Sequence, residues 1–150
     1  MPPGTGDTRL SIAQKVSLSG AVIVSTPQDI ALIDARKGLN MFKKVGVPII
    51  GLVENMSMFI CPKCDHESHI FGHGGAIEAA NGLKVDVLAQ IPLDLDIRHK
   101  TDTGQPVILT MPDSKQAEIY RVFASKVASY LGDYEKQQKG PVKIVFEESA

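Results

Sequence analysis

Short apolar runs alternate with an amphipathic segment in the first third of the chain. The runs 20–25 and 47–53 are rich in β-branched residues and lack polar alternation, which is typical of strands buried on both faces of a parallel sheet. The segment between them repeats an apolar residue every three or four positions, which predicts one buried helical stripe. The stripe consists of Ala31, Ala35, Leu39 and Phe42. Strand, helix and strand predict a βαβ unit and therefore an α/β fold.

The predicted helix carries signals at both ends. Thr26 stands before Pro27 and three residues before Asp29, so we expect Thr26 at the N-cap and Pro27 at the first helical position. Gly46 followed by Pro48 predicts the end of the helix.

The rest of the chain reads as one irregular segment followed by further regular elements. We expect residues 54–75 to be irregular, residues 76–81 to form a short helix and residues 85–91 to form a third strand. A last helix is expected to open at residues 112–114 and to end at Gly132, with a core stripe repeating every four residues. The stripe consists of Ile119, Phe123, Val127 and Leu131.

The chain divides at the end of this last helix. Residues 1–132 are expected to form one domain, and residues 133–150 a polar tail with an apolar island at 142–146. We expect the tail to be either disordered or an added edge strand.

Composition excludes several function classes. With 43% hydrophobic and 22% charged residues, the 150-residue chain has enough apolar material for an ordinary core. Its 16 basic and 17 acidic residues leave a net charge of −1, which argues against a nucleic-acid partner. No apolar run approaches the roughly 20 residues that cross a bilayer, so no membrane span is expected.

Cys61 and Cys64 are the only cysteines and carry the main chemical signal. Their two-residue spacing lets two thiolates bind one zinc or iron-sulfur centre from a single turn. A complete coordination sphere needs more donors, which either His66 and His69 or the cysteine pair of a second copy supplies. A thioredoxin-like redox pair requires a helix beginning in the second half of the motif, and the residues after Cys64 do not favour one.

Two other places carry weaker signals. Gly4 and Gly6 let the backbone approach an anion, while Thr5 or Asp7 could hold a metal-bound water, although a simple proline-glycine turn explains the same residues. Asn55 follows a strand and suits either the edge of an adenine base or an Asx-turn. No glycine is followed by lysine, so the chain has no Walker A motif.

Taken together, a series of motifs closely resembles the Mrp/nucleotide-binding-protein family of P-loop ATPases. The likeness runs from Met1 to about Leu131. The motifs are MPPGTGD at 1–7, STPQD at 25–29, DARKG at 34–38, ENMS at 54–57, CPKC at 61–64, HIFG at 69–72 and IPLD at 91–94. With DTGQP at 102–106, the chain looks most like the mitochondrial branch that delivers iron-sulfur clusters to respiratory complex I.

The resemblance implies a fold and a metal cargo. The fold would be a three-layer, doubly wound, mostly parallel α/β sheet of the P-loop NTPase (MinD/ParA-like) type, without its amino-terminal strands and phosphate loop. Cys61 and Cys64 from two subunits would together hold a bridging 4Fe-4S cluster. The homodimer would pass this cluster to apo iron-sulfur proteins, among them subunits of complex I.

The resemblance also implies an ATP/Mg site. Asn55, Pro92 and Asp94 would contact adenine, and residues 4–7 would form the switch below the γ-phosphate, with Asp7 as the catalytic candidate. Family members carry a Walker A segment and an aspartate before the Pro-Pro-Gly stretch, and both are expected upstream of Met1. We therefore expect ATP to drive the cycle in the full-length protein and no hydrolysis by this chain.

The remaining expectations concern compartment and alternatives. The resemblance points to the mitochondrial matrix, with the cytoplasm as the alternative, since any presequence would lie upstream of Met1. One alternative function is residual ATP hydrolysis that Asp7→Ala reduces. Another is a small zinc-binding interaction module built from Cys61, Cys64, His66 and His69.

Overall fold

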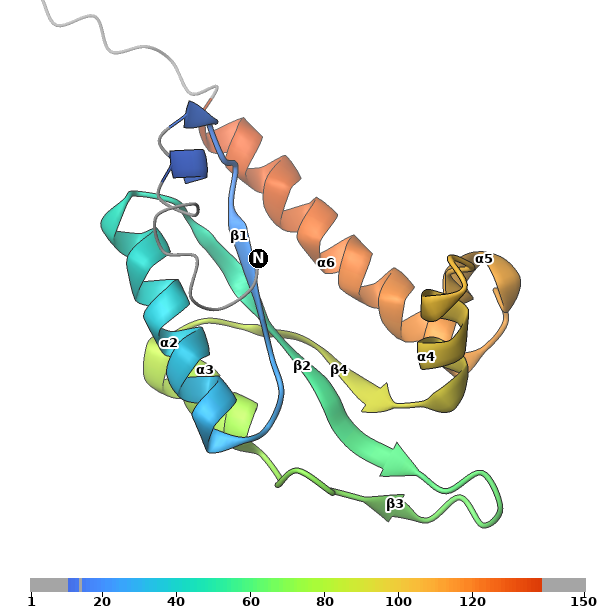
Figure 1. Ribbon diagram of the computed structural model, residues 1–150. Helices are drawn as coiled ribbons and strands as arrows, with labels where there is room; N and C mark the ends of the chain where they lie inside the picture. The colour runs from blue at the N-terminus through green and yellow to red at the C-terminus, as the bar shows by residue number, and fades with distance from the viewer. Residues whose placement is uncertain (1–10, 14, 139–150) are drawn as a thin grey trace, which may run out of the picture.

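Four strands form one sheet that is parallel except at the far end of its longest strand. The computed structural model describes residues 11–13 and 15–138 (Figure 1). The central strand β2 (Ile49–Ile60) pairs in parallel with β1 (Ala21–Ser25) on one side and β4 (Val87–Leu93) on the other. The short β3 (Glu67–Ser68) pairs antiparallel with the last two residues of β2. The mostly parallel α/β sheet is therefore confirmed.

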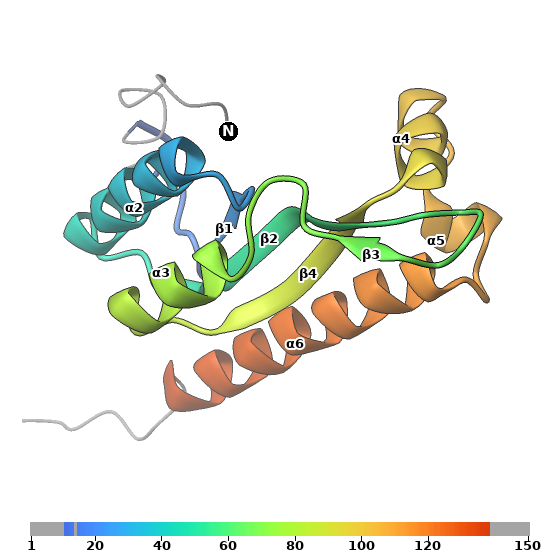
Figure 2. The same ribbon diagram turned by 90° about the horizontal axis from the view of Figure 1, so that it is seen from below.

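Helices cover both faces of this sheet, which gives three layers (Figure 2). The helices α2 (Asp29–Lys44) and α3 (Gly75–Leu83) lie on one face, and α6 (Lys115–Gln138) lies along the other. Two short helices, α4 (Leu95–Asp102) and α5 (Val107–Thr110), connect β4 to α6.

Each face of the sheet has its own hydrophobic core. On one face, α2 and α3 pack on β2 through a cluster of buried residues. This cluster consists of Leu32, Leu52, Ala76 and Ala79. On the other face, the predicted stripe of α6 packs against Ile50, Val53, Leu88 and Ile91. The stripe expected from the four-residue repeat is therefore confirmed, because Ile119, Phe123, Val127 and Leu131 all contact this second cluster.

The expectation that residues 54–75 are irregular is wrong in its first part. The strand that was expected to stop at Val53 continues to Ile60, and a hairpin follows it. The extension forms because β2 finds backbone partners far along the chain, with Glu54 opposite Gln90 and Phe59 opposite Leu93. Strand pairing of this kind overrides the polar residues that interrupt the apolar run.

The ends of α2 are only partly as expected. The predicted cap at Thr26 is wrong, because Gln28 occupies the N-cap position and makes no side-chain capping bond. Pro27 precedes the helix and is buried. Its carbonyl faces Gly75 at the start of α3, so the residues before α2 make a tertiary contact in place of a local cap. At the other end, Gly46 adopts a positive φ of 75° as expected.

The second half of the chain holds more helix than the sequence predicted. Both α4 and α5 were missed, and β4 lies two residues later than expected. The expected end at Gly132 is wrong, because the last helix continues to Gln138. Residues 139–150, with the apolar island at 142–146, lie outside the described residues. In the described part of the chain, no helix is long and apolar enough to cross a membrane.

Gly51 lies where β2 and β4 approach each other closely. A Cβ added to Gly51 would lie 2.6 Å from Leu88 Cγ and 2.7 Å from the backbone oxygen of Asp86. We expect Gly51→Ala to lower the free energy of unfolding by about 2 kcal/mol, measured by urea denaturation, because the backbone contact cannot relax.

Gly82→Ala is the matched control for this substitution. Gly82 lies in α3 with nothing within 4 Å of an added Cβ. Alanine there should leave stability unchanged or raise it by up to about 1 kcal/mol. Equal stability of the Gly51 variant and the wild type would contradict the tight strand contact.

Candidate metal centre

The two cysteines lie in the tight turn between β2 and β3. The backbone N–H of Cys61 donates to the oxygen of His66 at 2.9 Å, and the N–H of Asp65 donates to the oxygen of Cys61 at 2.9 Å. Asp65 adopts a left-handed φ of 54°, which aspartate tolerates better than most residues. Pro62 supplies the fixed φ that suits the first position of a turn. The sequence thus closes a short loop that holds both sulfurs.

The turn makes Cys61 a better thiolate than a free cysteine. Its pKa lies below the ordinary value of 9.0. The main cause is a hydrogen bond from the backbone of Lys63, followed by bonds from the side chain and backbone of Cys64. Desolvation and the negative charge of Asp65 oppose this shift with smaller effects. The thiolate is the form of cysteine that binds metals, and the lowered pKa favours it at Cys61.

The histidines do not complete a local zinc site. No group of three or more His, Cys, Asp or Glu side chains that could hold a metal ion occurs among the described residues. The Nδ1 atom of His69 lies 3.2 Å from the oxygen of Ser57, and its Nε2 atom lies 3.3 Å from Glu67 Oε1. The ring also packs edge-on against His73, with 4.2 Å between centroids. Both ring nitrogens of His69 therefore face other groups, Ser57 and Glu67, within the hairpin.

A thioredoxin-like redox pair also lacks its structural frame. A strand does precede Cys61, as that arrangement requires. The residues from Pro62 to Cys64 form a turn, however, and β3 follows where a helix would have to begin.

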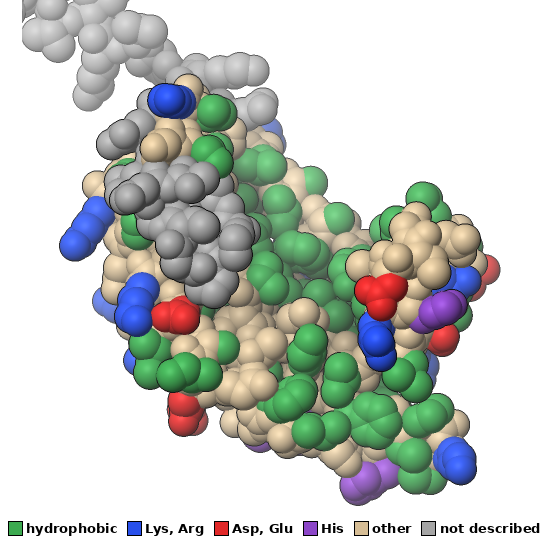
Figure 3. All heavy atoms as spheres, in the orientation of Figure 1, with side chains coloured by type: hydrophobic (Ala, Val, Ile, Leu, Met, Phe, Trp, Pro, Cys, Tyr) green, Lys and Arg blue, Asp and Glu red, His purple; other side chains and the backbone are tan. Residues whose placement is uncertain are grey.

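Exposed apolar side chains lie close to the cysteines along the chain. Met56, Ile60 and Ile70 are 37%, 43% and 56% exposed. Figure 3 shows hydrophobic side chains gathered over the end of the molecule that carries the β2–β3 hairpin. Apolar side chains grouped on a surface are typical of an interaction site.

The residues predicted to contact adenine converge on β2 and β4. Asn55 pairs with Ile91, which places it beside Pro92 on the neighbouring strand. The Oδ1 atom of Asn55 accepts the N–H of Met56 at 3.0 Å, so the side chain also shapes the local backbone. Met56 itself has a left-handed φ of 57°.

Asp94 has a structural task that the sequence did not reveal. It caps α4, because its Oδ1 atom accepts the N–H groups of Asp96 and Ile97 at 2.8 and 3.0 Å. Its Oδ2 atom accepts a bond from Gln116 Nε2 on α6 at 2.8 Å. The predicted residues Gly4, Thr5, Gly6 and Asp7 lie outside the described residues.

Sequence reasoning missed Glu54. This side chain is 1% exposed and lies between two strands of the sheet. Its two carboxyl oxygens accept bonds from the Ala76 N–H and from Gln90 Nε2. In the sequence, Glu54 is a charged residue directly after the apolar run 47–53, a pattern that predicts the end of a strand.

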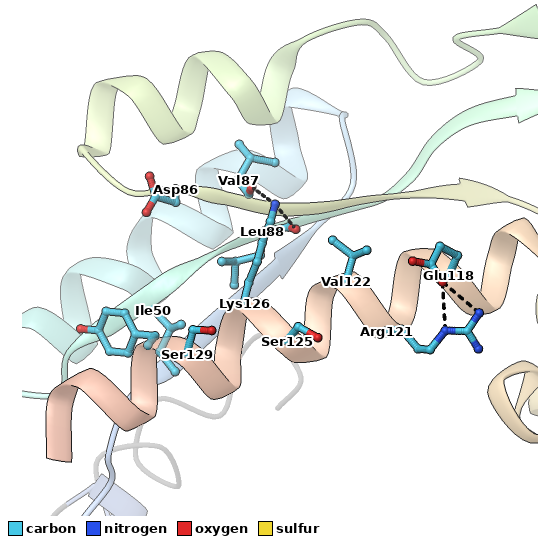
Figure 4. Close-up of a pocket in the computed structure, with 11 residues that line it drawn as sticks. Ile50, Asp86, Val87, Leu88, Glu118, Arg121, Val122, Ser125, Lys126 and Ser129 are labelled. Atoms are coloured by element: carbon cyan, nitrogen blue, oxygen red, sulfur yellow. Dashed lines mark hydrogen bonds and ion pairs between the residues drawn. The ribbon is translucent and has the colours of Figure 1, made fainter. Parts of the chain in front are cut away.

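A groove between β4 and α6 lies apart from these residues (Figure 4). Its volume is about 820 Å³, and none of the sequence-predicted site residues lines it. Lys126 crosses it and donates to the backbone oxygen of Leu88 at 2.9 Å, while Arg121 pairs with Glu118 at 2.9 Å. The lysine thereby covers carbonyls of the edge strand β4, which is a structural role.

The sequences of several iron-sulfur proteins match this chain over most of its length. An iron-sulfur cluster transfer protein from mouse, NUBPL, is 57% identical over 131 residues, which are 87% of this chain and 41% of that protein. A protein from Arabidopsis thaliana, described as an iron-sulfur protein required for NADH dehydrogenase, mitochondrial, is 46% identical over 96% of this chain and 46% of its own length. The chain therefore spans less than half the length of these relatives.

A solved structure agrees with the fold. It is the nucleotide-binding protein from Archaeoglobus fulgidus in complex with ADP and with cobalt, and it is 39% identical with a TM-score of 0.62. The match covers 70% of this chain and 43% of that one.

The family profile settles the relationship. The profile that matches residues 1–128 is that of the ParA family, with the description NUBPL iron-transfer P-loop NTPase. The match covers most of the chain and confirms the resemblance seen in the sequence motifs. This chain therefore belongs to the NUBPL iron-transfer group of the ParA P-loop NTPases.

Proposed function

We propose that the chain carries an iron-sulfur cluster that two copies hold between them and pass to apo iron-sulfur proteins. The observation behind this proposal is the paired thiols of Cys61 and Cys64 in one turn, which supply half of the four sulfur ligands of a 4Fe-4S cluster. The cluster is the cargo, and the chain's own contribution is to present two thiolates at the end of a hairpin.

A second copy is the simplest source of the other two ligands. Among the described residues, the two cysteines belong to no group of three or more His, Cys, Asp or Glu side chains that could hold a metal ion. Across a two-fold axis the same turn would add an identical pair, which fits the closed symmetry of most homodimers. The exposed apolar residues Met56, Ile60 and Ile70 would then lie close to the contact between copies.

The names of the relatives support the cargo and suggest the setting. The mouse relative is a cluster transfer protein, and the plant relative is required for a mitochondrial NADH dehydrogenase. We infer recipients among apoproteins of respiratory complex I and a location in the mitochondrial matrix. The ADP complex of the archaeal relative supports ATP/Mg binding in the full-length protein. Asn55, Pro92 and Asp94 would contact adenine there, and Gly4 to Asp7 would form the switch.

Reconstitution tests the shared cluster. Anaerobic incubation with iron and sulfide should give a brown chromophore and shift the chain from monomer to dimer in size-exclusion chromatography. Cys61→Ser and Cys64→Ser should each abolish both effects, because either change removes two of the four ligands in the dimer. Iron and sulfide analysis should give one four-iron cluster per two chains.

The double variant His66→Ala/His69→Ala separates this proposal from a zinc module. It should keep the chromophore and the dimer, because neither ring is a ligand. A colourless monomer that binds one zinc per chain, and loses it in the histidine variant, would contradict the shared cluster.

The pH dependence of alkylation tests the thiolate. Cys61 should react with iodoacetamide with a midpoint below pH 9.0, since its lowered pKa increases the thiolate fraction at any pH below that value. Cys64→Ala should raise the midpoint, because the bond from its side chain is lost. The midpoint should still stay below 9.0, because the backbone of Lys63 remains a donor. Mass spectrometry of the cluster-free chain gives the rates, and a midpoint at 9.0 or above would refute the arrangement.

Asn55→Asp tests adenine recognition apart from local structure. Aspartate keeps an oxygen that can accept the N–H of Met56, but it lacks the amide donor that reads the base. In the full-length protein, we expect affinity for ATP, measured by equilibrium dialysis, to fall about tenfold with little change in melting temperature. Unchanged affinity would assign Asn55 a purely structural role.

A further inference from the structure

Among the residues whose side chains the structure describes, Glu54 is the only buried ionisable one. It is 1% exposed and follows Leu52 and Val53, which are equally buried. A carboxylate removed from water is costly to the fold unless both oxygens find donors. The burial of Glu54 is therefore tolerated only because both of its oxygens accept hydrogen bonds.

Glu54 supplies the acceptor that the start of α3 otherwise lacks. The N-cap residue of α3 is Gly74, which offers no side-chain bond to the first turn. Glu54 Oε1 accepts the N–H of Ala76 at 3.2 Å from the neighbouring strand β2. A negative group at this position also interacts favourably with the helix dipole.

The second oxygen ties the same carboxylate to β4. Glu54 Oε2 accepts a bond from Gln90 Nε2 at 2.7 Å. Gln90 is also the backbone register partner of Glu54, so the side chains meet across adjacent strands. One carboxylate thus joins β2, β4 and α3.

These bonds close the base of the segment that carries the cysteines. Glu54 and Ala76 are 22 positions apart in sequence, and the outer part of β2, the cysteine turn and β3 lie between them. Beyond this base, Ser57 Oγ donates to the oxygen of Ile91 at 3.2 Å, and His69 Nδ1 lies 3.2 Å from the oxygen of Ser57. The hairpin projects past the body of the sheet in Figure 1, so its orientation depends on how firmly this base is held.

We propose that Glu54 is a positioning residue that fixes the cysteine hairpin against the sheet and so sets how tightly the chain retains its cluster. The proposal rests on the proposed carrier function. Without the carboxylate, α3 and β2 would keep their hydrophobic packing but lose the hydrogen bond that joins them at the base of the hairpin. The two thiols would then be presented in a wider range of orientations to a second copy.

Glu54→Gln is the main test, because it keeps the size and an acceptor oxygen but removes the charge. Charge-assisted hydrogen bonds are about twice as strong as neutral ones. We expect the N–H groups of Cys61 and Asp65 to exchange with deuterium about fivefold faster in the cluster-free chain. The half-life of the reconstituted cluster against an iron chelator should fall by a similar factor. Glu54→Ala should have a larger effect, and if that variant does not fold, the glutamine variant decides.

Ser114→Ala is the matched control. Ser114 Oγ accepts the N–H of Ala117 and caps α6 on the other face of the sheet. Its loss should lower the melting temperature as a cap substitution does, while exchange in the hairpin and cluster half-life stay within twofold of the wild type. A general loss of stability is thereby separated from a local loss of orientation.

Two results would overturn the proposal. One is hairpin exchange and cluster half-life in Glu54→Gln within twofold of the wild type. The other is equal loosening of the hairpin by Ser114→Ala, which would make the effect of Glu54 a matter of overall stability. A wild-type chain that takes up no cluster would instead refute the carrier function, and hydrogen exchange would still decide whether Glu54 holds the hairpin.

Discussion

The parallel pairing of β2 with strands on both of its sides is the constraint on which the rest of the structure depends. β1 and β4 hold its first half, the two hydrophobic cores pack on its two faces, and its last residues leave the body of the sheet to enter the hairpin. One strand therefore has two environments. Its buried half is held by packing and by neighbouring strands on both sides, whereas its outer half pairs only with the two-residue β3 and, at Phe59, with the end of β4.

This division explains the polar groups at the middle of β2. Glu54 bonds α3 and β4 where the buried half ends, and Asn55 and Met56 bend the backbone just beyond it. Ser57 then reaches back to β4 through the oxygen of Ile91. The buried side chains of Glu54 and Ser57 would be costly to the fold without hydrogen-bond partners, and both have partners here. Together they set the direction in which the hairpin leaves the sheet.

The arrangement of the cysteines is consistent with the proposed carrier role. A structural metal site has a closed ligand sphere, whereas this turn offers two sulfurs near the surface with backbone donors that favour the thiolate of Cys61. Ligands shared between two chains can be separated again, which allows a cluster to leave. The family relationship to iron-transfer P-loop NTPases is consistent with cargo handling of this kind.

The sequence by itself determined the α/β class, the parallel strands, the stripe of α6 and the cysteine pair, because each depends on local spacing or on residue chemistry. Only the tertiary structure decided the length of β2, the role of Glu54 and the bond from Gln116 to Asp94, because these partners lie 22 or more positions apart in sequence. The same holds for the start of α2, where Pro27 packs on Gly75 in place of a local threonine cap. A polar residue after an apolar run predicts the end of a strand. Glu54 can instead lie buried within β2 because donors distant in sequence, the Ala76 N–H and Gln90 Nε2, bond its carboxylate.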